Sequence, residues 1–243
     1  MYYPTIEAVK QLSAQGNLIP LYQEINADLE TPVSAYIKVA RPPYSFLLES
    51  VEGGERLARF SFIGTEPSQV ITTGLGYSAG QVDPLELVEN ILTKFTPVPV
   101  DGLPRFHGGA IGYLGYDSVR YFEPRVPEPA TTPLDLPESL FMLADTILVF
   151  DHLRHKILVV SHIHIDGPVE QAYKKAVSRI DNLVRRLQRP LPRSERIQRP
   201  KKPAPEEVIS SNFTFERYQD VVNQAKNFIE SGDVIQVVIS QRL

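Results

Sequence analysis

The chain has 243 residues and a mass of 27.3 kDa, and 42% of its residues are hydrophobic, so it can bury the core of one large domain or two small ones. Its formal net charge of −4, with both signs dispersed along the sequence, leaves no broad basic surface and argues against nucleic acid as a partner. Without cysteine it forms neither disulfides nor thiolate metal sites, and no stretch approaches the ~20 apolar residues of a membrane span, so we expect a soluble, cytoplasmic protein with no membrane contact.

The first elements are a short helix and two strands. Thr5 can cap a helix that runs to about Gln15. Residues 18–25 and residues 33–39 alternate apolar and other side chains, which predicts strands. Arg41-Pro42-Pro43 then ends the pairing, because proline lacks the backbone donor that a sheet needs.

A β-hairpin is predicted over residues 44–64. Two extended arms flank Gly53-Gly54, and glycine tolerates the positive φ angles of a short hairpin loop. In the second arm Phe60 and Phe62 share one face, because strand side chains alternate. Beyond the hairpin, residues 68–73 read as another short strand.

The middle of the chain combines one helix with glycine-rich and β-branched strands. Asp83 caps a helix that reaches about Phe95. Glycines at positions 108, 109, 112 and 115 let a strand lie close against another backbone, and no lysine follows them in the P-loop position. Leu140–Phe150 and Lys156–Ile165 form a second predicted hairpin. His162 and His164 share a strand face, but no third ligand is marked, so we predict no metal site.

The last third of the chain is predicted to contain a long helix, a linker, and then a further helix and strand. Apolar residues at helical spacing follow Pro168 as far as Leu187 and predict a helix lying on a sheet. Residues 191–206 are rich in proline and basic residues and mark a domain boundary. Thr214 caps another helix, and Val234–Leu243 reads as a buried strand that lacks partners within this sequence.

Two motifs in the predicted hairpin resemble a known family. Leu47-Leu48-Glu49-Ser50, followed by Arg59-Phe60-Ser61-Phe62-Ile63-Gly64, is similar to the N-terminal hallmark of anthranilate synthase component I, a chorismate-using enzyme. The resemblance implies that Ser50 lies in the site where tryptophan binds as feedback inhibitor, with Glu49 and Leu48 beside it. Spacing alone favours a serine that ends a strand through a side-chain bond to the backbone. The long motif reverses this preference and favours the binding role.

The resemblance also implies the domain plan. It predicts an α+β protein, largely antiparallel sheet or sandwich with packed helices, followed by the first helix and strand of a second α+β domain that binds chorismate. Residues 1–190 are then the regulatory, tryptophan-sensing domain, 191–206 the linker, and 207–243 the start of the catalytic domain. The family's magnesium-binding glutamates have no counterpart in this sequence, so Mg²⁺ belongs to the full enzyme and its ligands lie elsewhere.

The implied activity makes anthranilate and pyruvate from chorismate and ammonia in tryptophan biosynthesis. A glutamine amidotransferase subunit, component II, delivers the ammonia. Gln236 matches a position where water-adding chorismate enzymes carry a lysine base; glutamine accepts no proton, which suits an ammonia nucleophile. Gln236 could equally be a strand residue with a satisfied amide. Since the resemblance covers about half of the enzyme, we expect this chain alone to be inactive.

Two alternatives remain open at this point. The sister enzyme that makes aminodeoxychorismate also has glutamine at the position of Gln236, but its early motif departs from Leu-Leu-Glu-Ser. A stand-alone tryptophan-binding module without catalysis would form a closed sheet, and its tryptophan affinity would fall in Ser50→Ala. Product identity in the full-length protein separates the first alternative. A tryptophan titration separates the second, because a fragment of the larger enzyme is expected to bind tryptophan weakly or not at all.

Overall fold

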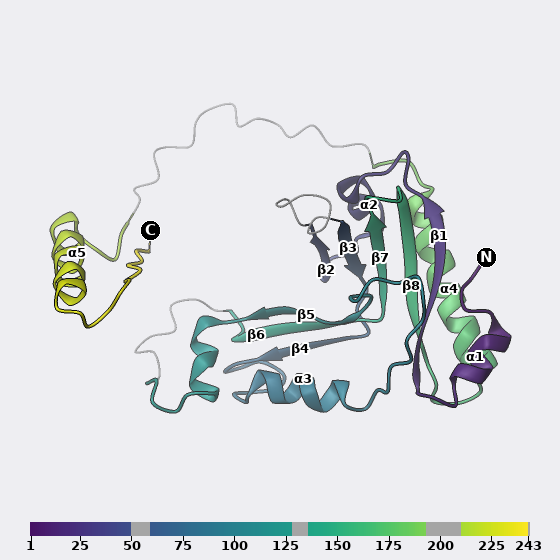
Figure 1. Ribbon diagram of the computed structural model, residues 1–243, viewed down its shortest axis with the longest axis horizontal. Coiled ribbons are helices and arrows are strands. Elements are labelled where there is room, and N and C mark those ends of the chain that lie inside the picture. Colours follow the sequence, from purple (N-terminus) through teal and green to yellow (C-terminus); the bar gives the residue numbers. More distant parts are fainter. Residues whose placement is uncertain (50–58, 128–135, 193–209, 243) are drawn as a thin grey trace. The chain divides into compact units, whose positions relative to one another are not determined.

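The computed structural model describes residues 1–49, 59–127, 136–192 and 210–242. The chain divides into two compact units, Met1–Pro192 and Arg193–Leu243. The first unit combines a five-stranded and a three-stranded antiparallel sheet with helices (Figure 1). The predicted α+β class with antiparallel sheets is confirmed.

The five-stranded sheet has the order β1-β8-β7-β3-β2, and all its neighbours are antiparallel. Its strands are β1 (Leu18–Asn26), β2 (Ser45–Leu48), β3 (Phe60–Thr65), β7 (Thr146–Asp151) and β8 (Lys156–His164). Strand β8 is buried along almost its whole length because β1 and β7 flank it. The pairing of β2 with β3 confirms the two arms of the first predicted hairpin, whose turn lies outside the described residues.

The three-stranded sheet has the order β4-β6-β5. Its strands are β4 (Gln69–Thr73), β5 (Gly109–Leu114) and β6 (Ser139–Ala144). The single strand predicted over Leu140–Phe150 is wrong, because Asp145 divides the run into β6 and β7, which belong to different sheets. The Asp145 carbonyl accepts a hydrogen bond from the His162 N–H at 2.9 Å instead of continuing the β6 ladder.

The described helices are α1 (Ile6–Leu12), α2 (Pro32–Val39), α3 (Pro84–Leu92), the 3-10 helix η1 (Tyr116–Tyr121), α4 (Val169–Leu187) and α5 (Phe215–Glu230). Side chains cap the first turns of α1, α2, α3 and α5, whereas α4 and η1 begin without a side-chain cap. The strand predicted over residues 33–39 is wrong, since these residues form α2. There Thr31 and Ser34 form a reciprocal capping box and Pro32 occupies the first turn, which outweighs the apolar alternation.

Helices cover one face of the five-stranded sheet. Figure 1 shows α4 lying along this face, where its apolar stripe packs on β1 and β8. The stripe consists of Ala172, Ala176, Ile180, Leu183 and Leu187. On the opposite face a second apolar cluster includes Ile147, Val149, Leu158 and Val160, with Phe62 and Phe106 packed against it. Within the described residues of the first unit, the helices α1, α2 and α4 pack on the first face, and this opposite face adjoins the candidate site.

The described part of the second unit contains helix α5 and an extended tail. Thr214 caps α5 as predicted, with its hydroxyl accepting the Arg217 N–H at 3.2 Å. The strand predicted over Val234–Leu243 is not formed in the described residues 234–242, because no neighbouring strand pairs with them. The tail instead returns to the residues before α5, where the Asn212 side chain accepts the Arg242 N–H at 2.8 Å. None of the helices in the described ranges is long and apolar enough to cross a bilayer.

Candidate functional site

A pocket of about 620 Å³ lies between the two sheets of the first unit. Strands β2 and β3 supply one wall, strands β5 and β6 the other, and the segment before β5 contributes Phe106. The lining residues are Leu48, Glu49, Arg59, Phe60, Phe62, Phe106, Ala110, Ile111, Gly112 and Phe141. A volume of roughly 300–1,000 Å³ with mostly apolar walls and a few polar groups is typical of small-molecule sites.

Aromatic rings form the interior of the pocket. Phe60 and Phe62 both reach it because they stand two residues apart on β3, as the sequence predicted. Phe106 meets Phe62 edge to face, with ring centroids 5.1 Å apart. Phe141 closes the opposite side from β6. A flat aromatic ligand can therefore stack and pack among several phenyl rings.

Gly112 allows the β5 wall to form. A Cβ atom at this position would lie 1.7 Å from the Leu140 carbonyl oxygen of the paired strand β6. This is the close backbone approach that the glycine-rich segment predicted. Because Gly112 has no side chain, β5 can pair closely with β6, and Ile111 and Gly112 line the pocket beside Phe141.

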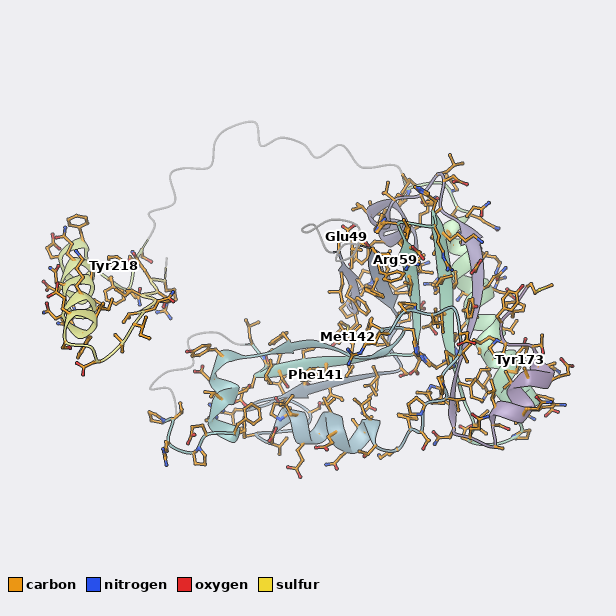
Figure 2. All side chains as sticks on the ribbon, in the orientation of Figure 1. Glu49, Arg59, Phe141, Met142, Tyr173 and Tyr218 are labelled. Atoms are coloured by element: carbon orange, nitrogen blue, oxygen red, sulfur yellow. The ribbon has the colours of Figure 1, made fainter. Side chains whose placement is uncertain are left out.

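Two opposite charges line the same pocket as the phenyl rings. Figure 2 shows Glu49 and Arg59 at the ends of β2 and β3, and Phe141 on the facing three-stranded sheet. Glu49 is exposed, whereas the Arg59 side chain is 32% exposed and its guanidinium carbon lies 4.7 Å from the centre of the Phe60 ring. One carboxylate and one guanidinium beside an aromatic cavity suit a zwitterionic ligand with an aromatic ring.

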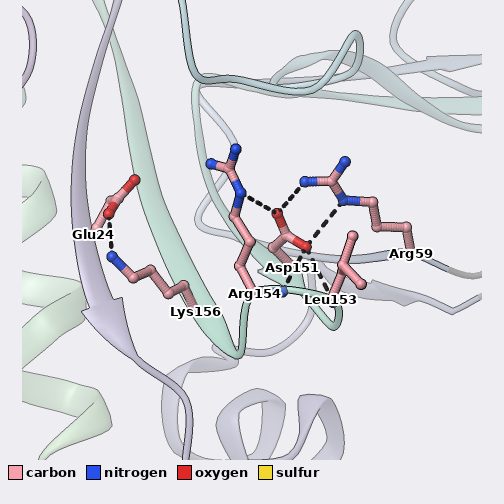
Figure 3. A network of polar contacts seen from close by, with 6 residues as sticks. All are labelled: Glu24, Arg59, Asp151, Leu153, Arg154 and Lys156. Carbon is pink, nitrogen blue, oxygen red and sulfur yellow. Dashed lines mark hydrogen bonds and ion pairs between the residues drawn. The ribbon is translucent and has the colours of Figure 1, made fainter. Parts of the chain in front are cut away.

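A buried carboxylate at the end of β7 holds the guanidinium of Arg59. Asp151 accepts bonds from Arg59 Nε at 3.0 Å and Nη2 at 2.6 Å (Figure 3). Burial raises the pKa of Asp151, but hydrogen bonds from Arg59 and from the N–H groups of Arg154 and Leu153 outweigh it, so the pKa lies below its usual value. Asp151 is therefore ionised at neutral pH, and the pair is a charged, two-pronged hydrogen bond.

The structure brings some of the predicted site residues together and leaves others apart. Leu48 and Glu49 line the pocket. Ser50 lies outside the described residues, next to Glu49 in the chain. Gln236 is exposed in the tail of the second unit and has no site around it in the described residues 210–242.

Sequence reasoning missed two of the four phenyl rings that line the pocket. Phe106 and Phe141 come from segments about forty or more residues away from the hairpin motif, and tertiary packing of Phe106 and of the three-stranded sheet against the hairpin places them beside it. Arg59, Phe60 and Phe62 carried a signal, because they belong to the motif that follows Leu-Leu-Glu-Ser. The alternation of the second arm placed the two phenylalanines on one face but did not say what that face meets.

The described residues do not fit a magnesium ion. They contain no group of three or more histidine, aspartate or glutamate side chains placed to hold a metal, and Mg²⁺ requires several oxygen ligands. His162 faces His107, with Nε2 and Nδ1 3.0 Å apart, and His164 faces Asp145 at 3.3 Å. Burial lowers the pKa of His162 to about 4, so its ring is neutral at ordinary pH.

Comparisons with known proteins agree on one family. The sequence pattern of chorismate binding enzymes matches residues 43–243. Anthranilate synthase component 1 of Acetivibrio thermocellus is 39% identical over all of this chain and 51% of its own length, and that of Synechocystis is 40% identical over the same shares. The crystal structure of anthranilate synthase component I from Streptococcus pneumoniae shares the fold, with a TM-score of 0.50 and 24% identity over 86% of this chain and 46% of that one. The chain spans about half the length of the curated relatives it matches.

Proposed function

Because the chain belongs to the chorismate-binding enzyme family and is homologous to the N-terminal part of anthranilate synthase component I, we propose that it is the regulatory portion of such an enzyme. In this proposal residues 1–190 sense tryptophan, residues 191–206 connect, and residues 207–243 begin the chorismate-binding catalytic domain. The whole enzyme makes anthranilate and pyruvate from chorismate and ammonia. It takes ammonia from a glutamine amidotransferase subunit and uses Mg²⁺ held by residues outside this chain.

The pocket lined by Glu49, Arg59 and the phenyl rings is the observation that supports the proposed tryptophan-sensing role. Tryptophan has an ammonium group, a carboxylate and a large flat ring. In this proposal Glu49 binds the ammonium group, Arg59 binds the carboxylate, and Phe62 with its neighbours packs against the indole. The motif resemblance adds Ser50, which follows Glu49 directly in the chain.

The size of the aromatic contribution sets the expected affinity. An indole buries on the order of 200 Å², which is worth about 5 kcal/mol at 25 cal/mol per Å². The loss of translational and rotational freedom offsets much of this gain. Two charge-assisted contacts, from Glu49 and Arg59, add about 1.5–3 kcal/mol each. The net binding free energy of about 4–5.5 kcal/mol corresponds to a dissociation constant on the order of 0.1–1 mM for this chain alone.

The position of the pocket explains how binding can regulate. Its walls belong to two different sheets, β2 and β3 on one side and β5 and β6 on the other. A ligand that contacts both walls favours the arrangement of the sheets in which both contacts are made. In the whole enzyme, tryptophan then inhibits by stabilising an arrangement of this domain that the active catalytic domain disfavours.

Calorimetric titration of the 243-residue chain with tryptophan tests the sensing role. The unmodified chain should bind, and Phe62→Ala should weaken binding on the order of tenfold, because it removes the ring that meets Phe106. Leu29→Ala is the control, since Leu29 is 96% exposed and does not line the pocket. Absence of binding up to the solubility limit of tryptophan would contradict the sensing role.

The second part of the proposal, that most of the catalytic site lies outside this chain, is tested by measuring formation of anthranilate. Anthranilate is fluorescent, so its release from chorismate and ammonia can be followed continuously. The 243-residue chain should release none, because the proposal places most of the catalytic site outside it. Turnover of chorismate by this chain alone would contradict the placement of the catalytic site outside it.

A further inference from the structure

We propose that Asp151 is a positioning residue that orients the Arg59 guanidinium toward the carboxylate of the bound amino acid. The inference rests on the proposed function, in that tryptophan is the ligand. Asp151 itself does not line the pocket, whereas Arg59 does. Its role is therefore exerted through Arg59.

The backbone brings Asp151 to Arg59 through sheet pairing. Asp151 ends β7 and is the register partner of Phe60 on β3, and Arg59 directly precedes Phe60. The backbone N–H of His152 donates to the Arg59 carbonyl at 2.9 Å, which extends the pairing by one step. Backbone pairing of the adjacent strands β7 and β3 therefore fixes the relative positions of Asp151 and Arg59.

The carboxylate of Asp151 is anchored independently of Arg59. Its Oδ1 also accepts the backbone N–H groups of Leu153 and Arg154, each at 3.2 Å, in the turn that leads to β8 (Figure 3). The side chain is only 6% exposed. A carboxylate held by the turn cannot rotate to follow Arg59, so Arg59 must conform to it.

This anchoring determines which edge of the guanidinium remains for a ligand. Asp151 takes Nε and one hydrogen of Nη2, and the guanidinium lies over the Phe60 ring. Nη1 and the second hydrogen of Nη2 are left to donate into the pocket that Arg59 lines. A carboxylate requires donors in one plane, and Asp151 sets that plane.

The summed charge of Arg59 and the two charged side chains next to it, Asp151 and Arg154, still favours binding of an anion. The Arg154 Nε lies 3.9 Å from Asp151 Oδ2, so one carboxylate stands between two guanidinium groups. The three side chains together carry a net charge of +1. Glu24 and Lys156 form a separate ion pair at 2.7 Å on the neighbouring strands and touch neither Arg59 nor Asp151 through their side chains (Figure 3).

The experiment compares two ligands in matched variants of the chain. Tryptophan and tryptamine share the indole and the ammonium, but only tryptophan has a carboxylate. In Asp151→Asn the dissociation constant for tryptophan should rise on the order of tenfold, while that for tryptamine stays unchanged. Arg59→Lys should show the same selective loss, and the double variant should lose little more than either single one, because both changes break the same contact.

Glu24→Gln is the control, because it removes a nearby carboxylate that does not hold Arg59. It should leave both dissociation constants unchanged. If Asp151→Asn does not fold, Asp151→Glu keeps the charge but displaces the guanidinium, and the same selective loss of tryptophan binding is expected.

The outcomes separate this inference from the proposed function. Equal weakening of tryptophan and tryptamine by the Asp151 variants would show a purely structural role and overturn the inference. So would unchanged binding of both ligands. If the unmodified chain binds neither ligand, the sensing function itself is wrong, and the positioning role is wrong with it.

Discussion

Replacing Gly112 by alanine tests the close contact between β5 and β6 that forms one wall of the pocket. The added Cβ would lie 1.7 Å from the Leu140 carbonyl oxygen and 2.7 Å from its carbonyl carbon. Carbon and carbonyl oxygen normally approach no closer than about 3.3 Å. Because both atoms belong to the backbone of the paired strand, the two strands must separate by roughly 1.5 Å.

The cost follows from overpacking and from the hydrogen bonds that the separation breaks. Overpacking costs about 1–3 kcal/mol, and each lost backbone bond adds about 1 kcal/mol. We expect Gly112→Ala to lower the free energy of unfolding by about 3–4 kcal/mol, a large part of the ~5–15 kcal/mol typical of a domain. Urea denaturation followed by circular dichroism measures this difference.

A second glycine in the same unit provides the matched control. Gly167 has no neighbouring atom within 4 Å of an added Cβ. Gly167→Ala should therefore change the free energy of unfolding by no more than about 0.5 kcal/mol. If Gly112→Ala is as mild as Gly167→Ala, β5 and β6 do not pair in the register that builds the pocket.

Three further changes test the surrounding structure. Asp83→Ala removes the side chain that accepts the N–H groups of Leu85 and Glu86, and urea denaturation should show a loss of about 1 kcal/mol. Burial lowers the pKa of His162 to about 4; since the unfolded chain takes up this proton from about pH 6.5 downward, the free energy of unfolding should fall by up to about 3 kcal/mol toward pH 4. His162→Gln should remove that part of the pH dependence, and an unchanged pH profile would contradict it. Arg186→Met breaks a buried bond to the Val39 carbonyl and a 2.5 Å pair with Glu66, so the thermal midpoint should drop by several degrees.

Local signals in the sequence predicted much of the fold. The cap at Thr5, the cap at Asp83 and the apolar stripe after Pro168 each marked a helix that the structure contains. Residues 33–39 show the limit, because their apolar side chains fit an alternating strand as well as a short helix. The capping box at Thr31 favours the helix, and the alternation of apolar side chains alone does not reveal it.

Contacts between distant segments were beyond local reasoning. Nothing in the β-branched run around Asp145 marks the corner where the chain leaves one sheet for the other. The motif named Leu48 and Glu49, and both line the pocket, while their role in binding tryptophan stays a prediction. Phe106 and Phe141 complete the pocket only through the pairing of β5 with β6 and the packing of Phe106 against Phe62, which are tertiary events.

A crystal structure of the 243-residue chain grown with tryptophan would show whether the pocket binds this amino acid. We predict the indole among Phe60, Phe62, Phe106 and Phe141, the ammonium at Glu49, and the carboxylate on the edge of Arg59 that Asp151 leaves free. Tryptophan bound elsewhere on the chain, or bound in this pocket with its carboxylate away from Arg59, would contradict this prediction.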